Sequence, residues 1–403
     1  MARIVQKYGG SSVANVERIF NVARRVAQTA SNGNEVAVVV SAMGDATDEL
    51  LSLAEQITSF PPERELAMLL STGEQISIAL LTMALHKLGC EAISFTGAQA
   101  GVMTSGTHTN ARICRFEAAK VLQALAAGKI AVVAGFQGVN AGGEIQTLGR
   151  GGSDTTAVAL AAAIGADYCE IYTDVDGVYT VDPRVVPKAR RLEEITYDEM
   201  LELASLGAKV LHPRAVECAK EHQVVIHVRS SFHEGKGTLV KEAASVEKGT
   251  VISGIACDED QVKFALMGVP DQPGVAATIF SAVAEAGVNV DLIVQSIHRN
   301  GENDILFTVA KADFVKVQRV LEPLVRKIGA KELRHQSNVA KISVVGAGMI
   351  HHTGVAAGMF QALASAGINI EIISTSEIKI SCLIAAKHLQ KAAEAIHDYF
   401  QLS

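Results

Sequence analysis

TLGRGGSDTT, residues 147–156, leads directly into the apolar run Ala157–Ile164. This order predicts a glycine-rich loop followed by a buried helix. Glycine lets the backbone adopt positive φ angles and approach a ligand closely, and the unpaired N–H groups that begin a helix favour an anion. Arg150 can add a bidentate contact to a carboxylate or a phosphate. The stretch therefore predicts a site for a small anion, with a capped glycine turn as the simpler alternative.

The composition indicates a globular chain of two or three domains. The chain has 403 residues, 49% of them hydrophobic, which is enough for substantial cores. The formal net charge of −7 argues against a nucleic-acid surface, because phosphate binding needs clustered Lys and Arg. Six cysteines without a CxxC pair indicate reduced thiols and a cytoplasmic protein. We expect no signal peptide, no membrane span and no dedicated metal site.

The first half alternates short β-branched segments with helical ones. The expected strands are Ile4–Lys7, Glu35–Ser41, Ala92–Thr96, Ile130–Gly135 and Glu170–Thr173, and the expected helices are Val16–Thr29, Thr72–Leu88, Ala118–Ala127 and Asp154–Ile164. The strands are too apolar to alternate, which is typical of a parallel sheet covered on both faces. We therefore predict a doubly wound α/β domain over residues 1–245, with ligands beyond the carboxyl ends of its strands.

The second half contains an internal repeat. Residues 274–296 align with 354–376 at a constant offset of 80, and twelve of these 23 positions are identical. A duplication of this size predicts two similar small domains, over 262–336 and 337–403. The first unit has room for a final strand near 330–335, whereas the second ends after a helix. We therefore expect the strand 251–257, which precedes the first unit, to complete the second.

Two loops of the first half carry residues suited to phosphates. Lys7-Tyr8-Gly9-Gly10-Ser11-Ser12 combines an ammonium, two glycines and two hydroxyls at a helix start, but it matches neither standard nucleotide-binding fingerprint. Ser41 ends the second expected strand, and Thr47 begins the next helix. A helix N-cap is the simpler interpretation of Thr47, and a capped turn is the simpler interpretation of the first loop.

Further loops carry chemistry suited to an amino acid and a nucleotide. Glu74 lies in the first turn of an apolar helix, where a carboxylate suits the helix dipole and could also bind a substrate ammonium. YTDVDGVYTVDPR, residues 172–184, follows a buried strand and suits a base, a ribose and phosphates. It partly imitates a calcium loop but lacks the downstream glutamate. Lys209 could add a second ammonium, although an ordinary surface lysine is the simpler interpretation.

Six motifs occur in one order along the chain, namely KYGGSS, VVVSAMG, STGEQ, TLGRGGSDTT, YTDVDGVYTVDPR and GAKVLHPRA. With them the chain resembles the aspartate kinases of the amino-acid kinase superfamily. Its repeated tail resembles their paired ACT domains, which are α+β and ferredoxin-like. The resemblance spans essentially the whole chain. Tyr8 and Ser11 stand where the family usually has Phe and Thr, and Ser296 replaces a common Asn in the first ACT unit.

The resemblance implies phosphorylation of the L-aspartate β-carboxylate by ATP with Mg²⁺, giving 4-phospho-L-aspartate at the start of the lysine, threonine and methionine pathway. A carboxylate is ionised at pH 7, so no general base is needed, and catalysis rests on positioning and charge neutralisation. The resemblance assigns Lys7, Asp154 and Lys209 to catalysis. It assigns Lys7, Gly9, Gly10, Ser11, Ser41, Thr173, Asp174, Tyr179, Arg184 and Lys209 to ATP. It assigns Ser41, Thr47, Glu74, Arg150, Gly151, Gly152, Ser153 and Asp154 to aspartate. No residue is assigned to the metal, which the ATP phosphates and water would hold.

The resemblance also implies feedback inhibition by lysine, threonine or both through the ACT pair. The implied effector residues are Asp271, Gly274, Val275, Ala276, Asn289, Val290, Asp291, Gln295, Thr353, Gly354, Val355, Asn369 and Ile370. ACT domains of the family usually share a sheet across a subunit interface. A homo-oligomer is therefore expected, with a separately translated copy of the regulatory half as a candidate partner.

Two alternatives stay open at this point. A sister kinase could act on another acid, such as glutamate, carbamate or a nucleoside monophosphate, although Arg150 with Glu74 suits an α-amino acid. A non-catalytic amino-acid sensor could retain the same fold, although such a sensor would have no need of Lys7 and Asp154.

Overall fold

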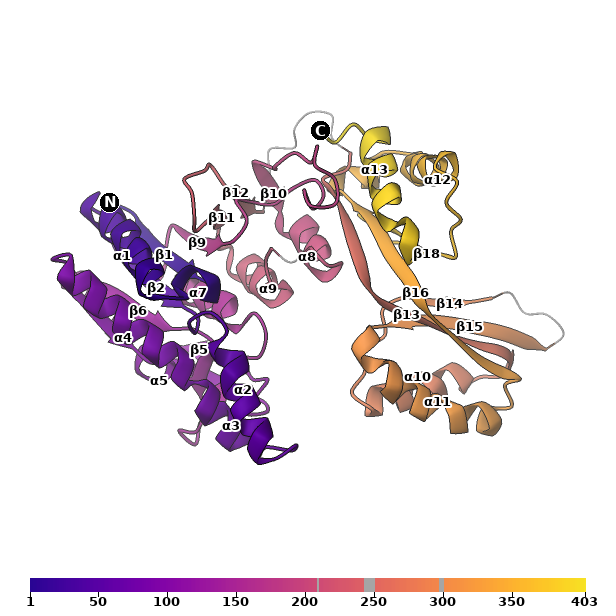
Figure 1. Cartoon of the computed structure of the whole chain (residues 1–403), viewed down its shortest axis with the longest axis horizontal. Helices are drawn as coiled ribbons and strands as arrows, with labels where there is room; N and C mark the ends of the chain where they lie inside the picture. The colour runs from indigo at the N-terminus through magenta and orange to yellow at the C-terminus, as the bar shows by residue number, and fades with distance from the viewer. Residues whose placement is uncertain (209, 243–250, 297–300) are drawn as a thin grey trace. The chain divides into compact units, whose positions relative to one another are not determined.

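The computed structural model describes residues 1–208, 210–242, 251–296 and 301–403 (Figure 1). The chain forms two compact units. The first comprises Met1–Tyr179 and Arg191–Gly249, and the second comprises Thr180–Arg190 and Thr250–Ser403. The segment Thr180–Arg190 thus belongs to the second unit, although it lies within the predicted first domain. Lys209 lies outside the described residues.

An eight-stranded sheet organises the first unit, in the order β10-β12-β11-β9-β1-β2-β6-β3. Its strands are β1 (Arg3–Tyr8), β2 (Glu35–Val40), β3 (Ala92–Phe95), β6 (Ile130–Ala134), β9 (Tyr168–Thr173), β10 (Glu194–Thr196), β11 (Ile226–Ser230) and β12 (Thr238–Lys241). All neighbouring strands are parallel except β11 and β12. The predicted mainly parallel α/β sheet is confirmed, and the five predicted strands match to within two residues.

Helices cover both faces of this sheet. α1 (Val16–Ser31) and α4 (Thr72–Lys87) share a core with β2 and β6 on one face, while α6 (Ala119–Ala126) and α7 (Gly152–Ile164) pack on these strands from the other side. The remaining elements are η1 (Gly10–Val13), α2 (Ala46–Ile57), α3 (Glu63–Leu70), α5 (Gly97–Ala100), α8 (Tyr197–Ser205) and α9 (Pro213–His222). Burial on both faces explains the continuously apolar strands, since Val38 and Val39 of β2 point to opposite faces and both have no exposed surface.

A second, four-stranded sheet of the first unit was not predicted. Its order is β5-β4-β7-β8, from β4 (Val102–Ser105), β5 (Arg112–Phe116), β7 (Gln137–Val139) and β8 (Ile145–Thr147). The strands have three to five residues and mixed polarity, so hydrophobic periodicity does not reveal them. β8 leads into the loop at residues 148–151, which precedes α7.

A six-stranded sheet organises the second unit, in the order β14-β15-β13-β16-β18-β17. Its strands are β13 (Gly254–Pro270), β14 (Ile293–Gln295), β15 (Glu302–Val309), β16 (Glu332–Val345), β17 (Ile372–Thr375) and β18 (Lys379–Ala385). The two central strands run through both repeats. Gly254–Asp258 of β13 oppose Lys341–Val345, and Lys263–Met267 oppose Glu332–Gln336. The strand ahead of the first repeat therefore pairs with the first strand of the second repeat.

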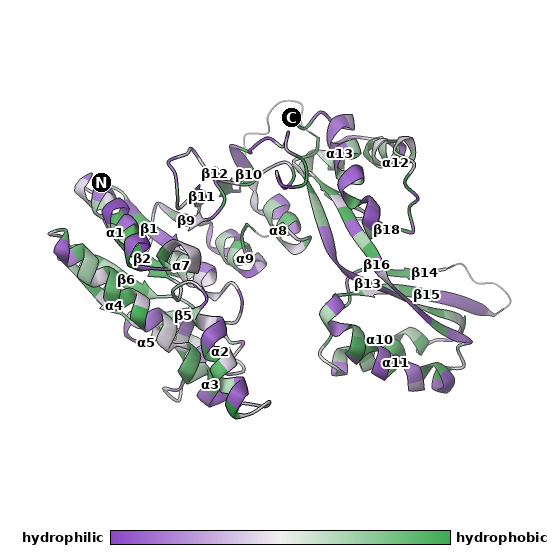
Figure 2. Cartoon of the chain, in the orientation of Figure 1, coloured by the Kyte–Doolittle hydropathy of each residue, from purple (hydrophilic) through white to green (hydrophobic). Residues whose placement is uncertain are grey.

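The helices of the second unit are α10 (Val275–Glu285), α11 (Phe314–Ile328), α12 (Val355–Ser365) and α13 (Leu389–Tyr399), with the short turns η2 (Lys311–Asp313), η3 (Ala347–His351) and η4 (Ala386–His388). α11 carries many hydrophilic segments, whereas α4 of the first unit is largely hydrophobic (Figure 2). Val181 and Val186 of the segment Thr180–Arg190 join the hydrophobic core that contains α12 and α13.

Among the residues that the structure describes, one helical stretch, Glu63–Lys87, is long and apolar enough by composition to cross a membrane, and half of its most apolar window is buried. It comprises α3 and α4. Glu74 within it is 2% exposed, and α4 packs on β3 and β6. We therefore interpret this stretch as a core helix of the first unit.

Candidate active site

A buried ion pair joins the end of β1 to the start of α7. The Lys7 ammonium lies 2.6 Å from Oδ1 of Asp154, and Lys7 is 9% exposed. The two residues lie 147 positions apart in the sequence. β1 lies between β2 and β9 in the sheet, so its carboxyl end is surrounded by the loops that follow its neighbours, as expected for a ligand site in an open α/β sheet. Asp154 thus holds the Lys7 ammonium in place at the carboxyl end of β1.

Glycine allows the loops after β1 and β2 to approach each other. The Gly44 N–H donates to the Gly10 carbonyl at 3.0 Å, and the Ser41 N–H donates to the Tyr8 carbonyl at 3.1 Å. A Cβ on Gly10 would lie 3.0 Å from the carbonyl oxygens of Ala42 and Gly44. A Cβ on Gly9 would lie 3.4 Å from the Lys7 ammonium. A side chain at Gly10 would therefore press on the loop after β2, and one at Gly9 would contact the Lys7 ammonium.

Glu74 places one carboxylate oxygen in the same region without a partner. Its Oε1 accepts a hydrogen bond from the Ala42 N–H at 3.1 Å, whereas its Oε2 is buried with no hydrogen-bond partner among the described residues. Burial raises the pKa of Glu74 to about 8. An unpaired buried carboxylate oxygen is costly, so this group is suited to a donor that a ligand supplies.

The loop between β8 and α7 holds Arg150 at the surface. Gly149 and Gly151 adopt left-handed conformations with φ of 73° and 71°, which side-chain-bearing residues rarely adopt. α7 begins at Gly152, so the backbone N–H groups of the predicted anion site lie at its first turn. Arg150 is exposed and is not ion-paired with an acidic side chain in the described part of the chain. Ser153 packs tightly against Gly135 at the end of β6.

Thr47 is not the N-cap of α2. The helix begins at Ala46 and its N-cap is Asp45, which makes no side-chain capping hydrogen bond. Thr47 instead lies partly buried in the first turn, so the simpler interpretation of this hydroxyl is wrong. Ser41 lies half-buried directly after β2.

The predicted nucleotide residues fall into three groups. Thr173 ends β9 and donates to Asp174 at 3.0 Å, and Tyr179 donates to Asp176 at 2.8 Å, all within the first unit. Arg184 belongs to the second unit, where its guanidinium binds Asp182 at 2.7 Å. Lys209 lies outside the described residues. The structure thus brings Lys7, Asp154 and the loops after β1 and β2 together within the first unit.

A buried network that joins β1, β9 and β11 is not visible in the sequence motifs. Tyr8 and Tyr172 stack with ring centroids 4.7 Å apart. Tyr172 donates to Glu170 at 3.0 Å, and Arg229 of β11 pairs with the same carboxylate at 2.9 Å. Tyr8 replaces the usual phenylalanine, and its hydroxyl donates to Gln6 at 3.3 Å. No pattern within a single motif could reveal a network that joins three strands.

Two family models match this chain. A model of the amino acid kinase family matches residues 2–230, and an ACT domain model matches residues 265–323 and 342–400. The aspartokinase of Mycolicibacterium smegmatis is 52% identical to the chain, over 100% of the chain and 97% of the relative. The chain belongs to the aspartokinases of the amino acid kinase family.

Solved aspartokinases have the same fold. Escherichia coli aspartokinase III in complex with aspartate and ADP matches with a TM-score of 0.81 and 25% identity, over 98% of this chain and 99% of that one. The same enzyme in complex with lysine and aspartate matches with a TM-score of 0.80 and 26% identity, over the same shares. The two states are described as R and T, respectively.

Two helices of the second unit, α10 and α12, begin in the same way. Gly274 and Gly354 precede α10 and α12 with φ of 94° and 92°, and neither helix has a side-chain cap. The N–H groups of their first turns could therefore bind a carboxylate, although the Val275 N–H of α10 already donates to the Gln272 carbonyl at 3.4 Å. Gln295 is exposed on the edge strand β14. Asn303 donates to Asp271 at 2.9 Å, so this carboxylate is partly occupied.

In each repeat, the turn that carries predicted effector residues forms an ion pair with a strand of the other repeat. Asp291, in the first repeat, pairs with Lys341 of β16, which is 2% exposed. Glu371 occupies the equivalent position of the second repeat and pairs with Lys263 of β13. Asp291 was predicted to bind an effector, yet its carboxylate already neutralises a buried lysine. Asn289, Val290, Asn369 and Ile370 lie in the same two turns.

In the described ranges, no group of three or more His, Cys, Asp or Glu residues could hold a metal ion. Magnesium usually keeps several waters and binds through substrate phosphates with one or two carboxylates.

Proposed function

We propose that the chain phosphorylates the β-carboxylate of L-aspartate with ATP and Mg²⁺. The observation that carries this proposal is the buried Lys7–Asp154 pair at 2.6 Å, next to two glycine-lined loops. An ammonium held in this way can neutralise the charge that develops on the transferring phosphoryl group. The acceptor carboxylate is already ionised at pH 7, so the proposed reaction needs no general base.

Charge complementarity assigns the residues that would bind aspartate, the phosphoryl acceptor. The exposed guanidinium of Arg150 suits the α-carboxylate of aspartate, and the unpartnered Oε2 of Glu74 suits its ammonium. Ser41, Thr47 and the N–H groups of Gly151–Ser153 would complete this pocket. Thr173, Asp174 and Tyr179 would bind ATP with Gly9, Gly10 and Ser11. Arg184 and Lys209 remain candidates for ATP binding. Mg²⁺ would arrive with the ATP phosphates.

Regulation is the second part of the proposal. The paired ACT domains would bind lysine, threonine or both, with the effector carboxylate at the starts of α10 and α12. A ligand inhibits only if it binds two conformations with different affinity. We further propose that the protein is cytoplasmic and assembles as a homo-oligomer through its ACT domains.

The test is ATP-dependent and aspartate-dependent ADP release by the full chain. Glutamate serves as the control acceptor, and lysine and threonine are added singly and together. Turnover with aspartate and not glutamate supports the proposal. Turnover with glutamate would overturn the assigned acceptor, and no turnover in folded protein would favour an amino-acid sensor.

A further inference from the structure

The triplet His212-Pro213-Arg214 has no role in the site described so far. It begins α9, with His212 as the N-cap and Pro213 as the first helical residue. The Nδ1 atom of His212 accepts a hydrogen bond from the Arg214 N–H at 3.3 Å. Proline at this position suits a helix start. The helix start therefore orients the His212 imidazole relative to the backbone.

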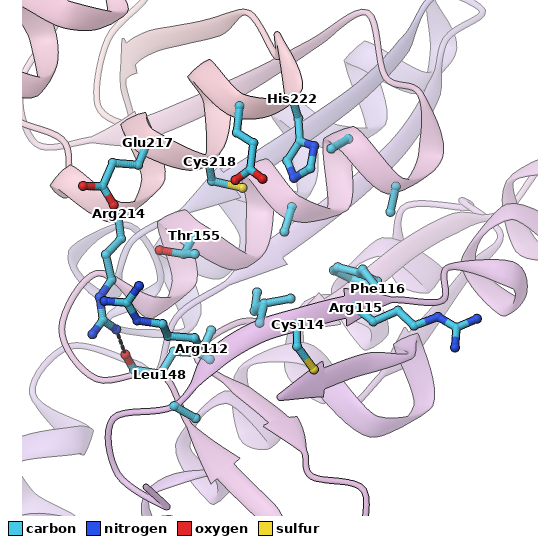
Figure 3. Close-up of a pocket in the computed structure, with 16 residues that line it drawn as sticks. Arg112, Cys114, Arg115, Phe116, Leu148, Thr155, Arg214, Glu217, Cys218 and His222 are labelled. Atoms are coloured by element: carbon cyan, nitrogen blue, oxygen red, sulfur yellow. Dashed lines mark hydrogen bonds between the residues drawn. The ribbon is translucent and has the colours of Figure 1, made fainter. Parts of the chain in front are cut away.

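Arg214 reaches from α9 to the loop that carries Arg150. Its Nη1 donates to the Leu148 carbonyl at 2.8 Å, as Figure 3 shows, and its Nη2 donates to Oδ1 of Asn110 at 2.8 Å. The planar guanidinium offers its donors in a fixed fork. One side chain thus joins the loop start to the segment at 108–111. That segment is itself held against Thr147 by two backbone hydrogen bonds of 2.9 and 2.7 Å.

His212 contacts the other end of the same loop. A Cβ on Gly151 would lie 2.0 Å from Cγ of His212, so the imidazole lies directly against the glycine backbone. Burial lowers the pKa of His212, although the nearby Asp154 carboxylate acts in the opposite direction. The loop is therefore held at Leu148 by Arg214 and at Gly151 by His212, on either side of Arg150.

We propose that His212 and Arg214 are positioning residues for aspartate, acting through the loop at 148–151. The inference rests on the proposed function. Arg150 has no acidic partner among the described residues, so its direction depends on the backbone that carries it. α7 starts from the same loop and carries Asp154 in its first turn. Neither His212 nor Arg214 needs to touch the substrate, because both set the geometry of groups that do.

The test compares steady-state kinetics for the two substrates. Arg214→Met removes both hydrogen bonds while keeping a long side chain. The loss of charged hydrogen bonds predicts a fall of about 10- to 100-fold in kcat/KM for aspartate, with the KM for ATP changed by less than about twofold. Arg214→Lys keeps the charge without the fork and should lie between the two proteins. Arg112→Met is the matched control. Arg112 and Arg214 line one cavity of about 420 Å³, but Arg112 makes no hydrogen bond to the loop at 148–151 among the described residues.

Two further measurements separate positioning from folding. Arg214→Ala opens space for guanidinium from that cavity, so added guanidinium ion should restore part of the aspartate activity. Trypsin should cleave after Arg150 faster in Arg214→Met than in wild type, because the loop has lost its anchor. If Arg214→Met does not fold, Asn110→Ala removes one anchor at an exposed position and makes the same test.

The outcomes distinguish this inference from the proposed function. If the wild type does not turn over aspartate, the proposed function is wrong, and the tryptic cleavage rate still shows whether Arg214 anchors the loop at 148–151. If trypsin cleaves Arg214→Met after Arg150 no faster than it cleaves the wild type, Arg214 does not anchor this loop. Equal losses for ATP and aspartate, or unchanged kinetics beside an active wild type, overturn the positioning role.

Discussion

Glu74 gives the sharpest quantitative prediction, because its carboxylate is 2% exposed and one oxygen lacks a partner among the described residues. Burial raises its pKa to about 8 from an ordinary value of 4.5. At pH 7 about nine in ten molecules of the free protein would carry a proton on Glu74. Binding an ammonium favours the ionised carboxylate. Aspartate binding at pH 7 should therefore release about 0.9 proton, and at pH 9 only about 0.1.

Isothermal titration calorimetry in buffers of different ionisation enthalpy measures this number directly. The observed binding enthalpy changes with the buffer in proportion to the protons released. Glu74→Gln is the matched variant, because its side-chain oxygen can still accept from the Ala42 N–H. It should bind aspartate more weakly and release no proton. A wild-type release near zero at pH 7 would refute the assignment of Glu74 to the substrate ammonium.

The same pKa makes a separate prediction for the free protein. A raised acid pKa means that the folded state binds this proton more tightly than the unfolded state. Its stabilising contribution is complete below about pH 4.5 and is lost as the pH rises through about 8. Between pH 6 and pH 9 the wild type should lose about 2–3 kcal/mol of unfolding free energy relative to Glu74→Gln. Parallel stability curves from urea unfolding would show that Glu74 is not buried as described.

Three other predictions follow from ion pairs and exposed residues. Lys7→Ala should lower turnover by at least about 100-fold with an unchanged circular dichroism spectrum; wild-type ADP release would refute its role. Asp291→Asn leaves the buried Lys341 ammonium without its nearest carboxylate, so urea unfolding should show the second unit destabilised by about 2–3 kcal/mol, whereas the exposed control Glu285→Gln should change little. Gln295→Ala should weaken inhibition by the effector and leave uninhibited turnover intact, and coincident inhibition curves would place the effector elsewhere.

Local sequence was sufficient for the main sheet and its covering helices. Val36–Val40 is apolar throughout because both faces of β2 are buried, and this periodicity is visible without a structure. The four-stranded sheet could not be predicted because strands such as Gln137–Val139 are too short to show a hydrophobic periodicity. Their pairing depends on residues far apart in the chain, and hydrogen bonds between such segments leave little local signal.

The candidate site divides in the same way. Sequence motifs identified Lys7, Arg150 and Asp154, because glycine loops and helix starts are recognisable from neighbouring residues. Motifs could not say that Lys7 and Asp154 form one ion pair, nor that Glu74 is buried with an unpaired oxygen. They placed Thr180–Arg190 in the first domain, yet its valines join the core of the second unit.

By itself, the sequence determined the α/β fold class, the repeated regulatory half and the family, since these depend on periodicity, duplication and ordered motifs. Only the tertiary structure decided which charges neutralise each other, which carboxylate keeps its proton, and how Arg214 and His212 hold the loop of Arg150. The physical reason is distance. Electrostatic and hydrogen-bond energies depend on separations of a few ångströms, and residues 66 positions apart, such as Leu148 and Arg214, reach such separations only when the chain has folded.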